Sequence, residues 1–284
     1  MPLKKYILSI TLSLSSLLVF AQYQPTINGE LVEHAYYSLS YIEDHEQAEW
    51  VYYTINAGNA KRTDDFRPDP KVSTSSASLE DYKGSGYDRG HLCPAAAMKV
   101  NHTAMSQTFY MSNMSPQKPN FNRGIWKNLE ALVREWGWST ETHVVTGPIF
   151  KDNMGAIGSN KVTVPGSYYK VIYQPSSQLM IGFVLPNEKS EKALSEFILP
   201  VDSIESLTGI NFFSQVDDQL EAKLESQKGN INDWSRTSTK SAPNNVKPAV
   251  SSNQCKGTAK STGHRCKSKT NNANGYCRHH QNQS

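Results

Sequence analysis

Acidic residues are missing from the end of this 284-residue chain, because no aspartate or glutamate follows residue 234. The same stretch holds nine lysines and arginines, and two more lie near the N-terminus. The body between them carries 18 basic against 26 acidic residues, a net charge of −8. A broad basic face for nucleic acid is therefore excluded in this body. Attraction for phosphate has to come from a few local arginines, from a metal ion or from the tail.

Cysteine is scarce, and three of the four cysteines lie in the acid-free tail. Export would favour disulfides, but three cysteines leave one unpaired, and the fourth, Cys93, lies far away in the sequence. The odd number of cysteines favours a tetrahedral zinc site. Residues 254–284 are also too short a segment to form a hydrophobic core, so they need a metal or a cross-link to hold a fold. The tail resembles small Cys/His modules appended to bacterial proteins. The predicted ligands are Cys255, Cys266, Cys277 and His280, with His279 or His264 as alternatives to His280.

No apolar run is long enough to span a bilayer comfortably. Residues 1–21 have a basic start, an apolar stretch and a small residue at the end, which is the pattern of a signal peptide. No cysteine follows the apolar stretch, so lipoprotein processing is not indicated. We expect a secreted or periplasmic protein with no membrane association after cleavage; an uncleaved anchor is the alternative.

The rest of the chain divides by composition. Residues 22–234 have the aromatic and apolar content of a globular domain. Residues 235–253 are mostly Ser, Thr, Pro, Asn and Lys with almost nothing to bury, which predicts a flexible linker. The tail module follows at residues 254–284. Nothing in the sequence fixes the oligomeric state.

Patterns in the body predict an α+β fold with a central antiparallel sheet flanked by helices. The clearest helix spans residues 124–138, where one apolar stripe faces the core and Glu130 and Arg134 lie opposite. Further helices are predicted at 188–197, 201–208 and within 212–224. Strands are predicted at 36–41, 50–55, 87–92, 108–112, 144–146, 168–173 and 179–185, with 87–92 and 108–112 paired as a hairpin.

The segment Gly86–Pro94 contains the sequence Asp-Arg-Gly-His between glycines. His91 is the one side chain in it that takes up a proton near neutral pH without first being shifted. Arg89 offers a permanently charged planar donor group suited to phosphate oxygens. This combination indicates chemistry on a phosphate ester.

Asp-Arg-Gly-His resembles the signature of the DNA/RNA non-specific endonucleases, which have a ββα-metal active site. The resemblance continues, in the same order, through Ser112–Gln117, Asn120–Glu130 and Val144–Pro148 to Phe213. It implies a nuclease that depends on Mg²⁺ or Mn²⁺ and cleaves DNA and RNA with little sequence preference.

The resemblance also implies roles for individual residues. His91 is the general base, and Asn122, eight residues before Glu130, is preferred to Asn120 as the single protein ligand of the metal. Glu130 holds a water of that metal, and Asn113 keeps either the His91 region or the substrate in register. Without the motif, Glu130 and Arg134 read as a solvent-facing pair. The arginines expected to bind nucleic-acid phosphate are Arg89, Arg134 and Arg62, with Arg67 as the rival of Arg62.

Two other functions compete with this hypothesis. One is a non-catalytic protein that binds nucleic acid or cell-surface anions through its basic tail and carries a degenerate nuclease body. The other is a phosphodiesterase or phosphatase for small esters. The intact set of His91, Asn122 and Glu130 argues against degeneracy.

Overall fold

A computed structural model describes residues 23–234 and, in the C-terminal part, residues 253–258, 265–270, 274–277, 280 and 283. The chain divides into two compact units, Met1–Thr237 and Ser238–Ser284. The predicted signal peptide and residues 235–252 of the predicted linker lie outside the described residues. Among the helices that are described, none combines the length and the apolar character needed to cross a membrane.

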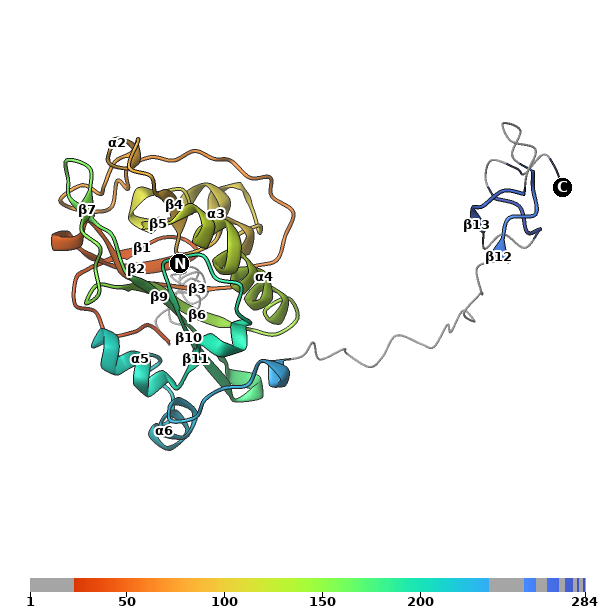
Figure 1. Cartoon of the computed structure of the whole chain (residues 1–284). Helices are drawn as coiled ribbons and strands as arrows, with labels where there is room; N and C mark the ends of the chain where they lie inside the picture. The colour runs from red at the N-terminus through yellow and green to blue at the C-terminus, as the bar shows by residue number, and fades with distance from the viewer. Residues whose placement is uncertain are drawn as a thin grey trace, which may run out of the picture. The chain divides into compact units, whose positions relative to one another are not determined.

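A seven-stranded sheet runs through the first unit, and every neighbouring pair in it is antiparallel (Figure 1). This confirms the predicted α+β class with a central antiparallel sheet. In spatial order the strands are β1 (Glu30–Glu33), β2 (Tyr37–Ile42), β3 (Gln47–Thr54), β6 (His143–Ile149), β9 (Ser167–Gln174), β10 (Leu179–Pro186) and β11 (Ile198–Leu199).

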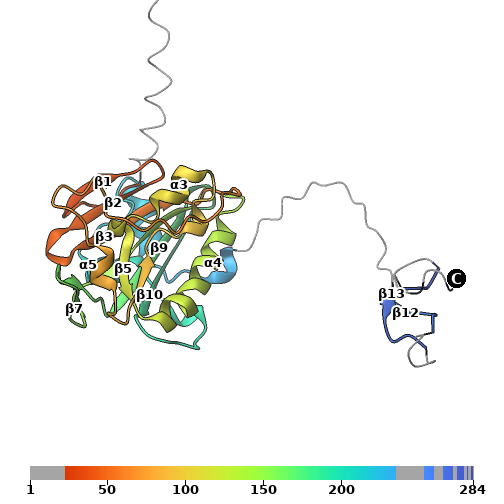
Figure 2. The same cartoon turned by 90° about the horizontal axis from the view of Figure 1, so that it is seen from above.

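Alternate residues of each central strand enter two different apolar cores, one on each face of the sheet. In β3, Val51 and Tyr53 belong to one core and Trp50 and Tyr52 to the other. In Figure 1, the paired strands β4 and β5 and helix α3 lie above the sheet, helix α4 lies to its right, and helices α5 and α6 lie below it; Figure 2 shows β5, α3 and α4 from above. We call these the upper and lower faces.

The upper face carries the segments that contain the signature. Its elements are β4 (Asp88–His91), η2 (Ala95–Ala97), α3 (His102–Gln107), η3 (Met111–Asn113), β5 (Met114–Gln117), the π-helical turn η4 (Phe121–Trp126) and α4 (Lys127–Trp136). The predicted helix at 124–138 is thus confirmed in its main part. Its apolar stripe contributes Ile125, Leu129 and Val133 to the upper core.

The lower face is covered by α5 (Val201–Thr208) and α6 (Asp218–Glu225), which bury Val201, Ile204 and Leu224 in the lower core. The remaining elements of the first unit are short. They are η1 (Glu43–His45), α2 (Leu79–Tyr82), β7 (Ala156–Ile157), β8 (Val162–Thr163), η5 (Pro175–Ser177), η6 (Leu194–Phe197) and η7 (Ile231–Trp234).

The second strand of the predicted hairpin was wrong. Residues 108–112 form turns and the start of η3, and the partner of β4 is β5, with His91 opposite Met114. The reason is that Thr108, just after α3, forms its hydrogen bonds within its own turn. Both its backbone N–H and its hydroxyl donate to the Met105 carbonyl. A segment that turns on itself in this way cannot join a strand ladder.

The helix predicted at 188–197 was wrong over most of its length, whereas the helix predicted within 212–224 is confirmed from Asp218 onward. Within 188–197 only Leu194–Phe197 is helical. Leu194 and Phe197 pack partly buried against the upper core, but none of residues 188–193 does, so no core contact extends the helix toward Glu188. Within 212–224 the helix starts only at Asp218. Phe213 has a positive φ of 57° and is fully buried in the lower core, which excludes it from a helix.

The second unit has few regular elements among its described residues. The strands β12 (Asn253–Gln254) and β13 (Lys269–Thr270) pair antiparallel, with Asn253 opposite Thr270. The buried side chains described here are the three cysteines, which form their own small cluster.

Candidate active site and C-terminal metal centre

Strand β4 presents the signature residues on a short, closely packed ladder. It pairs with β5 from Asp88 opposite Gln117 to His91 opposite Met114. A Cβ on Gly90 would lie 2.2 Å from the side-chain Cδ of Gln117, which is fully buried. Any larger residue at position 90 would therefore have to displace the buried Gln117 side chain, so glycine lets the two strands keep this close packing.

Asn113 fixes the chain just after His91 and is itself fully buried. Its Oδ1 accepts the Cys93 N–H at 2.8 Å, and its Nδ2 donates to the carbonyls of Cys93 at 3.0 Å and Thr108 at 2.8 Å. Its own carbonyl accepts the Leu92 N–H at 3.0 Å. Of the two roles left open by the sequence, holding the His91 region in register fits this geometry.

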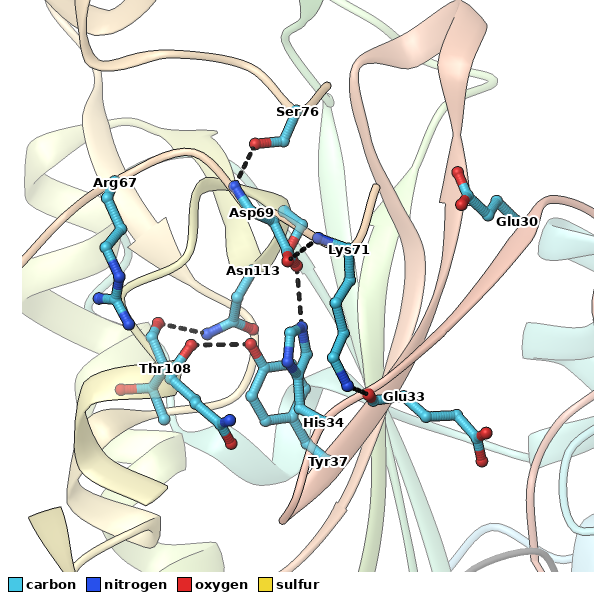
Figure 3. A network of polar contacts seen from close by, with 12 residues as sticks. Glu30, Glu33, His34, Tyr37, Arg67, Asp69, Lys71, Ser76, Thr108 and Asn113 are labelled. Carbon is cyan, nitrogen blue, oxygen red and sulfur yellow. Dashed lines mark hydrogen bonds and ion pairs between the residues drawn. The ribbon is translucent and has the colours of Figure 1, made fainter. Parts of the chain in front are cut away.

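A buried polar network supports the segment that carries Asn113 (Figure 3). The Asp69 carboxylate accepts hydrogen bonds from His34 Nε2 at 2.8 Å, from the Lys71 N–H at 3.0 Å and from the hydroxyl of Ser112. Burial raises the pKa of Asp69, but these bonds outweigh it, so the net shift is downward. The ionised carboxylate thus ties β1's end to η3.

His91 lies half-buried at the end of β4 between two aromatic rings. The ring centroids of Phe66 and Phe109 lie 5.7 and 4.9 Å from that of the imidazole, both edge-on. Nε2 is enclosed without a hydrogen-bond partner, so Nδ1 is the nitrogen left to exchange a proton. Burial lowers the pKa of His91 to about 3, with the positive charges of Arg62 and Arg89 adding to the effect.

Two of the predicted arginines flank this imidazole through the same two rings. The guanidinium carbon of Arg89 lies 4.2 Å from the centroid of Phe66, and that of Arg62 lies 4.9 Å from the centroid of Phe109. Arg67 instead stacks on Tyr110 and bonds to Asp65 and Ser106. Geometry therefore favours Arg62 over Arg67 as the arginine next to His91.

Asn122 is tied to the other end of the signature strand. Its Nδ2 donates to Asp88 Oδ2 at 2.9 Å, and Arg123 forms an ion pair with the same carboxylate. Because Nδ2 is used in this way, Oδ1 is the atom left to bind a ligand. Asn120 is exposed, and none of the hydrogen bonds within the described segments ties its side chain to β4.

Glu130 lies on α4 in a mixed electrostatic setting. Burial raises the pKa of Glu130, while the positive charges of Lys170, Arg134 and Arg62 oppose that shift. Arg134 folds back along the helix, with Nη1 3.4 Å from the Glu130 carbonyl. Arg62 also lowers the pKa of His91. The charge of Arg62 thus lowers the pKa of both the His91 imidazole and the Glu130 carboxylate.

Lys170 is a site residue to which the sequence analysis assigned no role. It is fully buried on the upper face of β9, with Nζ 3.3 Å from the Tyr53 hydroxyl and 4.8 Å from the Trp126 ring. Burial lowers the pKa of Lys170, and the negative charge of Glu130 opposes that shift. The sequence did contain a sign of this role, because Lys170 has the same strand period as Tyr168 and Ile172, which both enter the upper core. Asp88 was missed too, although it stands in the signature.

Two surface hollows border the predicted arginines. One, of about 390 Å³, is lined by Asp88 and Arg89, and another, of about 190 Å³, is lined by Lys99 and Arg134. The first hollow also contains Glu80 and Lys83 and is therefore mixed in charge, whereas the charged residues that line the second are both cations.

Comparison with known proteins agrees with this geometry. The profile of a family described as DNA/RNA non-specific endonuclease matches residues 19–219. The chain belongs to the DNA/RNA non-specific endonuclease family.

Relatives of this endonuclease are nucleases. It is 35% identical over 212 residues to a nuclease of Nostoc sp., which covers 68% of this chain and 77% of that protein. It is 34% identical over 217 residues to Nuclease C1 of Cunninghamella echinulata, covering 68% and 86%. A chain in the solved EndoG/EndoGI complex superposes with a TM-score of 0.63 at 32% identity, covering 68% of this endonuclease and 89% of that chain.

The C-terminal unit of the endonuclease brings its four predicted zinc ligands together. The ligand atoms of Cys255, Cys266, Cys277 and His280 all lie within 4.8 Å of one another. Nδ1 of His280 is 3.6 Å from Cys255 Sγ and 3.3 Å from Cys277 Sγ. The alternatives His264 and His279 lie outside the described residues.

The cysteines of this cluster are all free thiols, as is Cys93. Burial raises the pKa of Cys255, but the backbone N–H groups of Cys277 and Gly257 and the His280 ring outweigh it and lower the pKa to about 6. A second family profile, described as Domain of unknown function (DUF5763), matches residues 252–284.

Proposed function

We propose that this endonuclease hydrolyses phosphodiester bonds of DNA and RNA with the help of Mg²⁺ or Mn²⁺, and that His91 is its general base. One observation carries the proposal. Asp88 binds Asn122 at one end of β4, and His91 stands at the other end, so a single four-residue strand connects the predicted ligand to the predicted base.

A general base must be unprotonated before it acts, and His91 meets this condition. Its lowered pKa keeps the imidazole neutral at neutral pH, and the enclosure of Nε2 leaves Nδ1 for the attacking water. The edges of Phe66 and Phe109 prevent the ring from rotating away. The imidazolium formed in the step lies near Arg62 and Arg89, so its proton is readily released again.

The residues present fit a hard divalent cation. Asn122 Oδ1 is a neutral oxygen donor whose amide is oriented by Asp88, and Glu130 supplies a carboxylate to the hydration shell of the ion. When bound, such an ion neutralises charge on the phosphate and on the leaving oxygen. Burial raises the pKa of Glu130 to about 7, and the charges of Lys170 and Arg134 limit that rise.

Substrate contacts come from arginines and not from groups that read bases. Arg89, Arg62 and Arg134 offer charge-assisted hydrogen bonds to phosphate oxygens. Contacts to phosphates carry no sequence information by themselves, so weak sequence preference follows. The basic start and apolar stretch of residues 1–21 support export as the route by which the enzyme meets its substrates.

We also propose that the C-terminal unit binds one Zn²⁺ through Cys255, Cys266, Cys277 and His280. In a tetrahedral site with Zn–S of about 2.3 Å and Zn–N of about 2.05 Å, sulfur and nitrogen are about 3.6 Å apart. The two S···N distances of 3.6 and 3.3 Å are close to that value. The three cysteines of this unit are free thiols, and an odd number of cysteines cannot all pair as disulfides within the unit, which also favours a metal site.

The test is digestion of plasmid, single-stranded DNA and RNA by the full-length protein over a magnesium titration, with His91→Ala as the variant. We expect chelator-sensitive cleavage of all three substrates, and a loss of about 10³-fold or more in the variant with an unchanged circular dichroism spectrum. Nicking of plasmid by His91→Ala at the wild-type rate would contradict the assigned base. Activity confined to small phosphate esters would favour the phosphodiesterase hypothesis.

A further inference from the structure

The lower face of the endonuclease domain carries a cluster of carboxylates that the proposed active site does not use. Asp202 and Glu205 lie one turn apart on α5, and Glu225 lies at the end of α6. One oxygen from each of the three lies within 4.8 Å of the others. Figure 1 shows α5 and α6 below the sheet, on the face opposite to β4, β5 and α4.

Glu225 is the unusual member of this cluster. It is only 5% exposed, and its Oε1 is enclosed without a hydrogen-bond partner. A buried, unpaired carboxylate oxygen is costly unless a proton or a cation satisfies it. Oε1 of Glu221, on the same helix, is enclosed and unpaired as well.

Within the described residues, no positive side chain forms an ion pair with these acids. The ion pairs found there leave out Asp202, Glu205, Glu221 and Glu225 alike. The protein donor to the cluster's ligand atoms is the Phe212 N–H, which donates to Glu205 Oε1 at 2.8 Å. Burial and the neighbouring charges of Glu205, Glu221 and Asp202 raise the pKa of Glu225 to about 8.

The spacing suits a calcium ion. Ca²⁺ takes carboxylate oxygens at about 2.3–2.6 Å, so two ligands on opposite sides are about 4.6–5.2 Å apart. The three oxygens fall within that limit without any movement of the helices. The gradient of exposure also fits an entry path, since Asp202 is exposed, Glu205 half-buried and Glu225 buried. Zinc is disfavoured because the set contains no sulfur or nitrogen ligand.

We propose that Asp202, Glu205 and Glu225, with Glu221 beside them, form a structural calcium site that joins α5 to α6. An ion there reduces the repulsion among the clustered carboxylates and fixes two helices that cover the lower core. The site is independent of the proposed active-site metal, because the sheet separates the two faces.

Thermal unfolding of the full-length, chelator-treated protein tests this. At pH 7.5, saturating CaCl2 is expected to raise the Tm of the wild type by about 5 °C or more at a hundredfold excess over Kd, and MgCl2 by less. Glu225→Gln and Asp202→Asn are expected to lose most of that calcium response.

Two controls separate this site from the others. Glu188→Gln changes an exposed acid outside the cluster, and Asn122→Ala removes the proposed active-site ligand; both should keep the full calcium shift. Glu225→Gln should keep magnesium-dependent plasmid nicking. Absence of a calcium shift in the wild type would overturn the proposal. So would an equal calcium shift in Glu225→Gln, or its loss in Asn122→Ala alone.

Discussion

The endonuclease body and the C-terminal module hold their functional side chains by different means. In the body, His91 is placed by a strand ladder, by Asn113 and by two aromatic rings, all anchored in a core shared with the sheet. In the module, the described core consists of the three cysteines themselves. The body therefore positions its site through the fold, whereas the module depends on its ligands to have a fold.

Zinc removal sharpens this comparison most strongly. A zinc-selective chelator, added in the presence of calcium, is expected to abolish the dispersed amide signals of the module in a ¹⁵N–¹H spectrum while the Tm of the body stays unchanged. Elemental analysis should find one zinc per chain in the wild type. Cys266→Ser is expected to lose it, whereas Cys93→Ala, outside the module, should retain it. Retention of zinc by Cys266→Ser would refute the ligand set.

Asn113 tests the claim that the body positions His91 by its fold. Asn113→Ala leaves two backbone groups of Cys93 and the Thr108 carbonyl without their buried partner, at a cost of about 3 kcal/mol in the free energy of unfolding. The exposed Asn120→Ala should change it by less than about 0.5 kcal/mol. Urea denaturation measures both. Equal stability of the two variants would show that Asn113 is dispensable for the strand.

Lys170 tests the electrostatic part of the site. The positive charge of Lys170 opposes the upward shift of the Glu130 pKa, so Lys170→Met should raise that pKa further. Glu130 then loses its charge over a higher pH range, and nicking is expected to fall about tenfold at pH 6.5 but much less at pH 8.5.

The matched control is Lys127→Met, an exposed lysine on the same face of the domain. Its pH profile of plasmid nicking should match that of the wild type. If Lys170→Met lowers the rate by the same factor at every pH, Lys170 contributes only to packing and does not affect the pKa of Glu130.

Truncation after Trp234 has the smallest expected effect. Trp234 packs on Trp136 with ring centroids 4.7 Å apart, so the cut leaves the body's core complete. We expect a folded, active nuclease that retains DNA more weakly. For each phosphate that the basic tail neutralises in the full chain, the slope of log K against log salt should become shallower by about 0.9 after truncation. A truncated body that does not fold would contradict the predicted linker at 235–253.

Much of the fold could be predicted because strands buried on both faces stand out as β-branched and aromatic runs, and because the helices that cover the sheet show an apolar stripe. Strands β3, β9 and β10, and helices α4 and α5, fall where the apolar patterns placed them. Residues 108–112 were wrongly predicted as a strand because their apolar side chains are buried from a turn and not from a paired strand. Phe212 and Phe213 misled in the same way, since they fill the lower core from an irregular segment.

The site was predictable in its signature and less so in its supports. The cluster of Cys255, Cys266, Cys277 and His280 was expected from the sequence, and the structure brings these side chains together. Lys170 was not recognised, because a lysine in an apolar strand reads as solvent-facing until the neighbouring strands are known. The carboxylates of α5 and α6 lie twenty residues apart in the sequence and meet only through packing.

The central claim is that His91 and Asn122 act together across β4, and the magnesium dependence of plasmid nicking tests it most directly. Rates are compared for wild type, Asn122→Ala and Asn120→Ala over a magnesium titration. The account predicts a sharply weakened magnesium response in Asn122→Ala and a wild-type response in Asn120→Ala. Wild-type magnesium dependence in Asn122→Ala would contradict it.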